Sequence, residues 1–351
     1  MDMPRRTKAA ILTELRKPLI IDEIALPKNL TFGQVLVKIH YTTICGAQLN
    51  EIDGAKGPDK FLPHLLGHEA SATVLETGEG VITVKKNDLV VMHWRKSDGL
   101  QATPAKYVWG KKTVNAGWVT TFQEYAVVSE NRVTPIPSDF NRKIVPLFGC
   151  AVTSAFGVIN NDANVKIGES VLVVGCGGVG LNIIQGAKLT SANPIIGIDI
   201  LDSKLVMAKE FGADMTFNSS KIKDLEKEVK KIVGGKGLDI AIDTTGIPSV
   251  IEFCYSITQP QGKVILVGVP KKRSNVSLYT LPLHFKKILK GSEGGDSLPH
   301  IDIPKYIRLY RAGKLKLDKI ITHEFSLEKI NEAIQLVRSG RAGRVVLKIS
   351  P

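Results

Sequence analysis

Cysteine is scarce in this chain, since only four thiols occur among its 351 residues, at positions 45, 150, 176 and 254. Thiols so few and so scattered exclude a disulfide framework and fit a reducing compartment. No apolar run reaches about 18 residues, which excludes a transmembrane helix. The N-terminus, MDMPRRTKAA, lacks the apolar segment of a secretory signal. Repeats and low-complexity segments are also absent, so we expect an ordinary globular protein of the cytoplasm.

Acidic residues are outnumbered by basic ones, which gives a formal net charge of +13. The lysines are spread along the chain, as in DLEKEVKKIVGGKG, so a solvated surface explains most of this charge, with some attraction of anionic ligands. No concentrated basic patch or recognised module predicts nucleic-acid binding, and no membrane partner is expected. At 351 residues with 43% hydrophobic residues, the chain is long enough for two domains, each with its own core.

The most informative stretch is a glycine-rich loop between a buried strand and a helix. Four aliphatic residues, 171–174, are followed by Gly175, Gly177 and Gly180, and residues 181–189 continue with helical periodicity. In this spacing the glycines allow a sharp turn, close approach of a pyrophosphate and tight helix–strand packing, with the phosphates at the helix N-terminus. Asp199 ends the next strand, nineteen residues after Gly180. An acid there binds the adenosine ribose and repels a 2′-phosphate, which favours NAD over NADP.

Strands and helices alternate through residues 171–290, which predicts a doubly wound parallel sheet. We expect strands at 171–174, 195–200, 215–217, 238–246 and 262–270. Asp202 is the expected N-cap of a helix that stops at Gly212, and Pro248 opens another. Residues 8–44, 71–94 and 122–137 instead read as short antiparallel strands, with a polar surface lobe at 95–117. Helices are expected at 146–160, near 304–313 and at 326–340, and a last strand at 344–349.

Three residues could hold a metal ion: Cys45, His68 and Cys150. Two thiolates and one imidazole suit zinc, and three protein ligands leave a fourth position open for water or a substrate oxygen. Spacing alone is a weak indication, because a lone cysteine often packs as a small apolar residue.

The motifs taken together are more specific. Seven motifs occur in order along the chain: ICG, LGHEA, FGCAVTSAFG, VGCGGVG with Asp199, KGSEGGD, ITHEFSLEKINEA and SGRAGRVVLKI. Together they resemble the zinc-dependent medium-chain dehydrogenase/reductase (alcohol dehydrogenase) family. Within it, the loop and the GG after KGS resemble the branch of alcohol and glutathione-dependent formaldehyde dehydrogenases. The resemblance implies an α/β protein with a GroES-like β-rich catalytic domain at residues 1–152 and 295–351, and a Rossmann doubly wound parallel-sheet domain that binds NAD at 153–294. It also implies a homodimer paired through a sheet edge, with 276–284 as the candidate edge, although a tetramer remains open.

The resemblance assigns roles by position. Cys45, His68 and Cys150 match the ligands of the catalytic zinc, and Glu69 matches an acid beside the metal that can exchange with a ligand. The remaining matches are to the NAD site, and they are Gly175, Gly177, Gly178, Val179, Gly180, Asp199, Lys204, Val267, Gly268, Val269 and Arg344. Of these, Asp199 and Lys204 match the ribose contacts, Arg344 a pyrophosphate contact, and 267–269 the backbone near the nicotinamide.

Two departures from the family pattern affect these expectations. The family's structural zinc uses four cysteines in a lobe that residues 94–121 match, but this stretch contains none. We therefore expect one catalytic zinc and no structural zinc, with the lobe held by other means, such as packing of its Tyr and Trp side chains. In addition, Ala47 stands where the family has a proton-relaying Ser or Thr, and Asn50 where a histidine can stand. Proton transfer must then use water, Glu69, the substrate or another group such as His93.

The resemblance also implies a substrate pocket that includes Ala47 and residues 93–96, His-Trp-Arg-Lys. Trp94 would form an apolar wall, and Arg95 and Lys96 could bind a carboxylate or phosphate; exposure of both charges to solvent is an equal alternative. We expect a zinc-dependent NAD(H) oxidoreductase that interconverts an alcohol and an aldehyde or ketone by hydride transfer, acting on a polar sugar, polyol or sugar-acid-like small molecule. The alternatives are a metal-free quinone or enone reductase of the same fold and a non-enzymatic NAD-binding protein.

Overall fold

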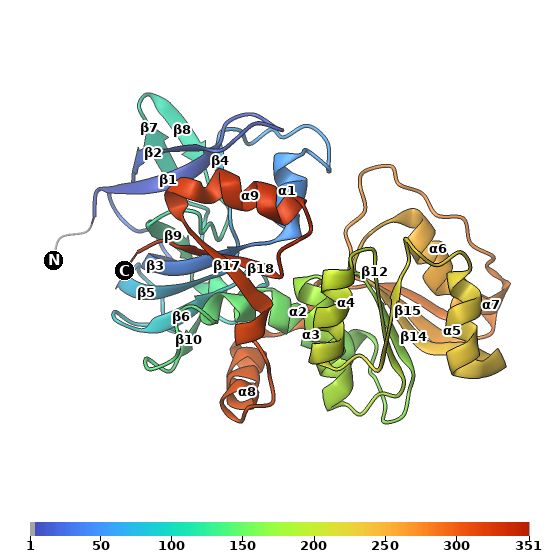
Figure 1. Ribbon diagram of the computed structural model, residues 1–351. Helices are drawn as coiled ribbons and strands as arrows, with labels where there is room; N and C mark the ends of the chain where they lie inside the picture. The colour runs from blue at the N-terminus through green and yellow to red at the C-terminus, as the bar shows by residue number, and fades with distance from the viewer. Residues whose placement is uncertain (1–3, 351) are drawn as a thin grey trace. The chain divides into compact units, whose positions relative to one another are not determined.

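The computed structural model describes residues 4–350, and the chain divides into two compact units. The first comprises the described chain up to Cys150, Leu298–Ala312 and the chain from Leu317 onward. The second comprises Ala151–Ser297 and Gly313–Lys316. The expected domain boundaries, 152/153 and 294/295, lie beside these divisions at 150/151 and 297/298. Figure 1 shows the course of the chain.

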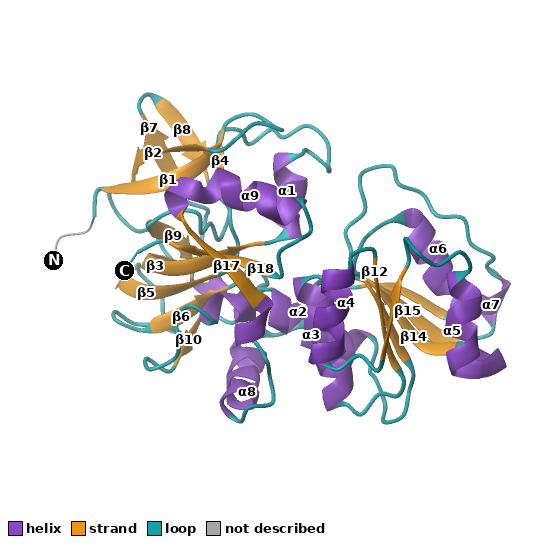
Figure 2. Cartoon of the chain, in the orientation of Figure 1, coloured by secondary structure: helices purple, strands orange, loops and turns teal. Residues whose placement is uncertain are grey.

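The first unit is built mainly of antiparallel strands (Figure 2). Its closed barrel has the order β1 (Arg6–Leu12), β2 (Ile20–Ala25), β7 (Lys106–Trp109), β8 (Lys112–Asn115) and β4 (His64–Leu65). A second sheet has the order β10 (Val133–Ile136), β6 (Leu89–Met92), β5 (Ala70–Thr77), β3 (Gln34–Ile44), β18 (Arg344–Lys348) and β17 (Ile321–Ser326), and β9 (Tyr125–Ser129) also pairs with β3. The helices of this unit are α1 (Gly46–Ile52), α8 (Pro299–Arg311) and α9 (Ile330–Arg338).

Helix α9 covers one core of the first unit. Its residues Ile330, Ala333 and Ile334 are buried against barrel residues such as Leu12 and against Val345 of β18. The spacing of these three residues places them on one face of the helix, so the apolar stripe of a sequence segment far down the chain closes the core begun by β1.

The second unit contains the predicted parallel sheet. Its strand order is β13 (Met215–Asn218), β12 (Ile195–Asp199), β11 (Val171–Val174), β14 (Leu238–Asp243), β15 (Thr258–Leu266) and β16 (Ile288–Gly291), all paired in parallel. The helices are α2 (Ala151–Gly157), α3 (Gly178–Leu189), α4 (Asp202–Phe211), α5 (Leu225–Val233), α6 (Pro248–Ile257) and α7 (Leu281–His284). The aliphatic runs of β11 and β12 are almost wholly buried, as expected for strands covered on both faces.

Short 3-10 and π segments complete the chain, and they are η1 (Glu130–Arg132), η2 (Val145–Gly149), η3 (Val158–Asp162), η4 (Gly234–Lys236), η5 (Gly294–Asp296), η6 (Asp318–Ile320) and η7 (Leu327–Lys329). The helix expected at 146–160 is therefore divided into η2, α2 and η3. Cys150 adopts φ −149°, ψ −69°, outside the helical region, which separates η2 from α2.

Two local expectations were wrong, and one helix was missed. Asp202 is the first helical residue of α4 rather than its N-cap, because its carboxylate accepts a hydrogen bond from Asn218 and pairs with Lys221 instead. Helix α5 was not expected, since its charges hid an amphipathic pattern; Asp224 caps it by accepting from the Lys227 N–H at 2.9 Å. The candidate sheet edge at 276–284 is a loop followed by α7, and β16 forms the edge.

The lobe expected at 95–117 is more ordered than its composition suggested, because it contributes β7 and β8 to the barrel. Tyr107 is fully buried, and its hydroxyl accepts the Val127 N–H at 2.9 Å. Trp109 donates from its indole nitrogen to Asp22 at 2.8 Å. Trp118, by contrast, is 43% exposed. Of the three aromatic residues, Tyr107 therefore makes the deepest contribution to packing of this lobe.

A buried carboxylate also anchors the lobe. Glu130 has no exposed surface, and its oxygens accept the backbone N–H groups of Ile82, Thr83 and Leu100, each at 2.7 Å. Burial acts to raise the pKa of Glu130, but the hydrogen bonds from Leu100, Thr83 and Ile82 outweigh it and lower the pKa. An ionised carboxylate that accepts three N–H groups ties the start of the lobe to the loop at 82–83.

Candidate active site

Three possible metal ligands meet at one end of the sheet that contains β3 and β5. Cys45 follows β3 and is the N-cap of α1, His68 lies in the loop between β4 and β5, and Cys150 follows η2. Antiparallel pairing sets Thr42 of β3 opposite Ala70 of β5, so the residues just beyond these positions come together. The ligand atoms of Cys45, His68 and Cys150 lie within 4.8 Å of one another.

The donor set fits zinc. Two sulfur atoms and one imidazole nitrogen match the ligands that zinc prefers, and three ligands leave one coordination position open. The Nε2 atom of His68 and the Oε2 atom of Glu69 are buried without a hydrogen-bond partner. Buried polar atoms are rarely left without a partner, and a metal ion would satisfy the His68 nitrogen. Within residues 4–350, no other group of three or more His, Cys, Asp or Glu side chains comes this close together.

The two thiols differ in their protonation. The hydrogen bond from Cys150 lowers the pKa of Cys45 well below the usual thiol value, with help from the positive charges of Arg344 and His68. The same hydrogen bond, together with burial, raises the pKa of Cys150. Burial acts to lower the pKa of His68, but the Cys45 thiolate and Glu69 outweigh it and raise the pKa.

Glu69 joins this cluster to a buried arginine. Its Oε1 atom accepts a hydrogen bond from the Thr43 hydroxyl and lies 3.3 Å from Nη2 of Arg344. Arg344 also donates from Nη1 to the carbonyl of Ile44 at 3.2 Å. Burial raises the pKa of Glu69, while the charges of Arg344 and His68 oppose that shift. The structure places Arg344 beside the metal ligands, 5% exposed; its contact with a pyrophosphate stays a prediction.

Gln48 is a residue of this site that the sequence analysis missed. It is fully buried in α1, its Oε1 atom accepts the Cys45 N–H at 2.7 Å, and its Nε2 atom contacts Nδ1 of His68. One side chain therefore fixes the backbone of one ligand and the ring of another. The signal was its position three residues after the N-cap, where a Gln side chain commonly returns to the N-cap N–H.

The residues expected around the substrate differ in exposure. Ala47 is exposed and Asn50 half-buried, both on α1. Trp94 and Arg95 are half-buried, and the Arg95 guanidinium lies 5.7 Å from the centre of the Trp94 ring. Lys96 is exposed. A tryptophan face beside a guanidinium is suited to a polar or anionic ligand.

His93 does not serve as a proton-transfer group. It is fully buried, its Nδ1 atom lies 2.8 Å from the carbonyl of Arg95, and its Nε2 atom lies 2.9 Å from the Thr134 hydroxyl. Because a carbonyl can only accept, Nδ1 carries the proton and Nε2 accepts from Thr134. Burial lowers the pKa of His93 to about 4. Both ring nitrogens are used internally, which corrects the suggestion that His93 relays protons.

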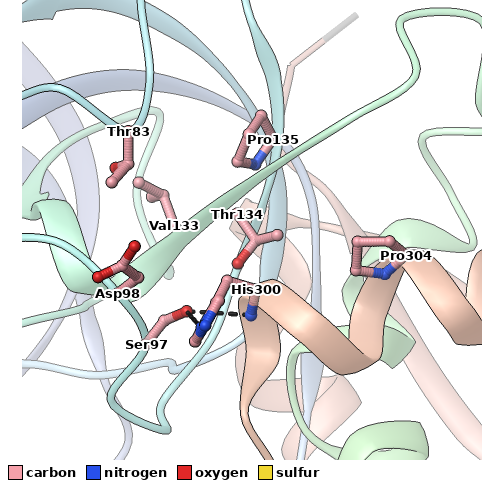
Figure 3. A pocket seen from close by; sticks show the side chains of 8 residues that line it. All are labelled: Thr83, Ser97, Asp98, Val133, Thr134, Pro135, His300 and Pro304. Carbon is pink, nitrogen blue, oxygen red and sulfur yellow. Dashed lines mark hydrogen bonds between the residues drawn. The ribbon is translucent and has the colours of Figure 1, made fainter.

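A separate small cavity in the first unit, shown in Figure 3, is lined by Thr83, Ser97, Asp98, Val133, Thr134, Pro135, His300 and Pro304. Two of its polar side chains, Ser97 and His300, bond to each other. The Ser97 hydroxyl oxygen accepts the His300 N–H at 3.0 Å, in the first turn of α8, and lies 3.1 Å from Nδ1 of the same residue. Ser97 thus satisfies a free amide at the start of α8.

The glycine loop of the second unit has the geometry expected for a nucleotide site. Gly175 adopts φ +92°, and a Cβ atom at Gly180 would lie 1.9 Å from the Gly175 carbonyl oxygen, so a side chain at either position would disturb the turn. Helix α3 starts at Gly178, and the first amides of a helix lack intrahelical acceptors. The space where a Cβ of Gly177 would stand is open. This loop can accept phosphate oxygens.

The other expected cofactor residues of the second unit lie along the ends of its strands. Asp199 ends β12; its Oδ2 atom accepts the Cys176 N–H at 2.8 Å, and its Oδ1 atom accepts the Leu201 N–H at 3.0 Å. Lys204 lies buried in α4. Val267 and Gly268 follow β15, where both N–H groups bond to Asp243, and Val269 is 56% exposed. Asp199 thus orders the turn after Gly175 as well as standing at the expected ribose position.

Comparison with known proteins agrees with this architecture. Residues 31–138 match the alcohol dehydrogenase GroES-like domain, and residues 178–312 match the zinc-binding dehydrogenase domain. The chain is 30% identical to an S-(hydroxymethyl)glutathione dehydrogenase of Paracoccus denitrificans, over 97% of this chain and 99% of the relative. It is 31% identical to an alcohol dehydrogenase class-3 of Cereibacter sphaeroides with the same coverage. The crystal structure of benzyl alcohol dehydrogenase from Acinetobacter calcoaceticus has the same fold, with a TM-score of 0.89 at 24% identity, over 99% and 100% of the chains.

The chain therefore belongs to the zinc-dependent medium-chain alcohol dehydrogenase family. It is an oxidoreductase of the alcohol dehydrogenase type, and the predicted fold, a GroES-like domain with a Rossmann domain, is confirmed. No helix in residues 4–350 is long and apolar enough to span a membrane.

Proposed function

We propose that this enzyme uses one zinc ion and NAD(H) to interconvert a polar alcohol and the corresponding aldehyde or ketone. The observation that carries the proposal is the cluster of Cys45, His68 and Cys150, with its unsatisfied His68 nitrogen. The same chain has a complete glycine loop and, at the end of the following strand, an acid. A sugar, polyol or sugar-acid derivative suits the Trp94 and Arg95 pair better than an apolar alcohol.

The side chains of Cys45, His68 and Cys150 would hold the zinc ion. Bound there, zinc supplies Lewis acidity, which lowers the pKa of an alcohol and polarises a carbonyl. Gln48 keeps Cys45 and His68 in place, and the Glu69 carboxylate is paired with Arg344 at 3.3 Å. A nicotinamide bound to the second unit would supply the hydride chemistry, and the protein would only position it.

The second unit supports NAD in preference to NADP. Asp199 stands at the end of β12, where its carboxylate can accept hydrogen bonds from ribose hydroxyls and would repel a 2′-phosphate. The first turn of α3 offers free amides for the pyrophosphate, and the backbone at Val267–Val269 is the proposed nicotinamide contact.

The alcohol proton needs a route that differs from a hydroxyl relay, because position 47 is alanine and His93 is occupied. Three acceptors remain: water, Glu69 and a second hydroxyl of the substrate itself. The last of these is consistent with a polyol-like substrate, since an adjacent hydroxyl can take part in the proton chain.

We further propose a cytoplasmic homodimer without a nucleic-acid or membrane partner. The edge strand β16 begins at Ile288, 44% exposed, and follows Tyr279 and Phe285, 71% and 62% exposed. Exposed apolar side chains beside an unpaired sheet edge suit a twofold contact with a second copy. All four cysteines are free thiols, in keeping with a reducing compartment.

The experiment is NAD reduction by a panel of diols, polyols and hydroxy acids, with the native enzyme, the Cys45→Ser variant and chelator-treated enzyme. We expect NADH formation that is lost in the variant and after chelation, and regained on adding Zn²⁺ to the chelated native enzyme only. Carbonyl or quinone reduction that survives both treatments would instead support the metal-free reductase. No turnover under any condition would support a non-enzymatic NAD-binding protein.

A further inference from the structure

Arg132 is a buried cation without an anion. Only 6% of this residue is exposed, and its Nη1 atom is buried with no hydrogen-bond acceptor. Across residues 4–350, its guanidinium makes neither a hydrogen bond nor an ion pair. Arg344 is buried to the same degree, but its guanidinium is met by Glu69 at 3.3 Å and by the Ile44 carbonyl. A buried guanidinium is normally paired, so Arg132 is an exception among the described residues of this unit.

The groups around Arg132 do not neutralise it. Its guanidinium lies 5.3 Å from the centre of the Trp118 ring, a contact that favours a cation but offers no hydrogen-bond acceptor. The carboxylate of Glu130, two residues earlier in the chain, is used by three backbone N–H groups. Burial and the positive charge of Arg95 together lower the pKa of Arg132. The two positive charges therefore repel each other at a site from which water is largely excluded.

The backbone holds the two arginines together. Strands β6 and β10 pair with Met92 opposite Val133, and the His93 N–H continues this ladder to the Arg132 carbonyl at 3.0 Å. The Ser97 N–H bonds to the Asn131 carbonyl at 2.9 Å, beyond Arg95. Both arginines also lie against a tryptophan, Arg95 on Trp94 and Arg132 on Trp118. A pair of fixed like charges with aromatic walls is typical of a binding site for an anion rather than of a stabilising core contact.

We propose that Arg132, with Trp118 and Arg95, binds an anionic oxygen group, a carboxylate or a phosphate, carried by the substrate or present as a free anion. A planar guanidinium binds either group through two parallel hydrogen bonds. If the anion is part of the substrate, this inference rests on the proposed function, and it restricts the substrate class to polar alcohols that carry an acid group. If the anion is free, the inference does not depend on the proposed function.

The first part of the test uses inorganic phosphate as a probe of the free-anion site. Thermal unfolding is measured at constant ionic strength with chloride or phosphate, for the native enzyme, Arg132→Met, Arg132→Lys and the exposed-residue control Arg308→Met. We expect phosphate to raise the Tm of the native enzyme and of the control, to raise it less for Arg132→Lys, and to leave Arg132→Met unchanged. Without phosphate, Arg132→Met should melt no lower than the native enzyme, because it removes an unpaired buried charge.

The second part compares 4-hydroxybutyrate with 1,4-butanediol as alcohols for NAD reduction, since the two differ only by a carboxylate at one end. If the substrate carries the anion, Arg132→Met raises KM for the hydroxy acid by roughly ten-fold or more and leaves kcat/KM for the diol within about two-fold. If phosphate raises the Tm but Arg132→Met does not change KM for the hydroxy acid more than for the diol, the site binds a free anion.

Two results would overturn the proposal. One is phosphate-independent Tm values together with equal KM changes for both alcohols. The other is a fall in Tm of Arg132→Met that is the same in chloride and phosphate, which is the behaviour of a purely structural arginine. If the native enzyme oxidises neither alcohol, nor any other alcohol of the wider panel, the proposed function fails, and the phosphate arm still decides the role of Arg132.

Discussion

Replacing Glu130 by glutamine tests how this enzyme holds the lobe that follows β6 without cysteines. The Glu130 carboxylate has no exposed surface and accepts three backbone N–H groups at 2.7 Å, from Ile82, Thr83 and Leu100. The amide of Glu130→Gln has one oxygen, so its NH₂ group must face at least one of these donors. One charge-assisted hydrogen bond is lost and the others become neutral.

The magnitude follows from these three bonds. Loss of a hydrogen bond to a charged group costs about 1.5–3 kcal/mol, and loss of charge on the remaining two removes roughly 1 kcal/mol each. We therefore expect destabilisation of about 3–5 kcal/mol. In a unit of this size that corresponds to a fall in Tm of roughly 6–20 °C.

Calorimetry and limited proteolysis provide the assay. The Glu130→Gln enzyme should melt earlier and be cleaved within residues 95–121 under conditions that leave the native enzyme intact. Since the folded pKa of Glu130 lies below its ordinary value, its stabilisation is present above the unfolded pKa and is lost as pH falls through the folded one; the variant should lack this acid-dependent loss. The exposed-residue control, Glu79→Gln, should behave like the native enzyme. Unchanged melting and proteolysis in Glu130→Gln would refute this account of the lobe.

Three further predictions concern the site and its surroundings. Gln48→Ala should weaken zinc retention roughly 10–100-fold, measured by competition with a chromophoric chelator, whereas Gln101→Ala, on the surface, should not. His93 has a folded pKa of about 4 against an ordinary 6.5, so between these pH values the unfolded state binds more protons than the folded state. The free energy of unfolding therefore falls as pH drops through this window, by up to about 3 kcal/mol. Denaturant titrations of His93→Gln should show a shallower pH dependence than the native enzyme, and an equal dependence would contradict this prediction. Asp199→Ser should lower the ratio of kcat/KM for NAD to that for NADP at least about ten-fold, and an unchanged ratio would separate Asp199 from ribose recognition.

Much of the fold was predictable because local patterns agreed with the global architecture. The strand, glycine loop and acid of residues 171–199 are specified by short-range sequence, and the structure has β11, α3 and β12 in those places. Helix α9 likewise carries its apolar stripe in the sequence. The short helix α5 was missed because its lysines and glutamates dominate the composition, although its burial centres on Val229.

The site was less predictable where long-range contacts decide it. The resemblance gave the ligand residues, but neither the pairing of Arg344 with Glu69 nor the burial of His93 follows from spacing, since each depends on strands far apart in sequence. The same is true of Arg132, whose lack of an acidic partner becomes evident only once β6 and β10 are paired. Gln48 was within reach of sequence reasoning, through its position in the first turn of α1.

The central claim is a single catalytic zinc centre formed by Cys45, His68 and Cys150. The most direct test is the metal content per chain, measured on protein purified without chelators, for the native enzyme and Cys45→Ser. The account predicts one zinc per native chain and almost none in the variant. A native chain without metal would contradict the Lewis-acid chemistry, and two zinc ions, one of them retained in Cys45→Ser, would contradict the single centre and the metal-free lobe.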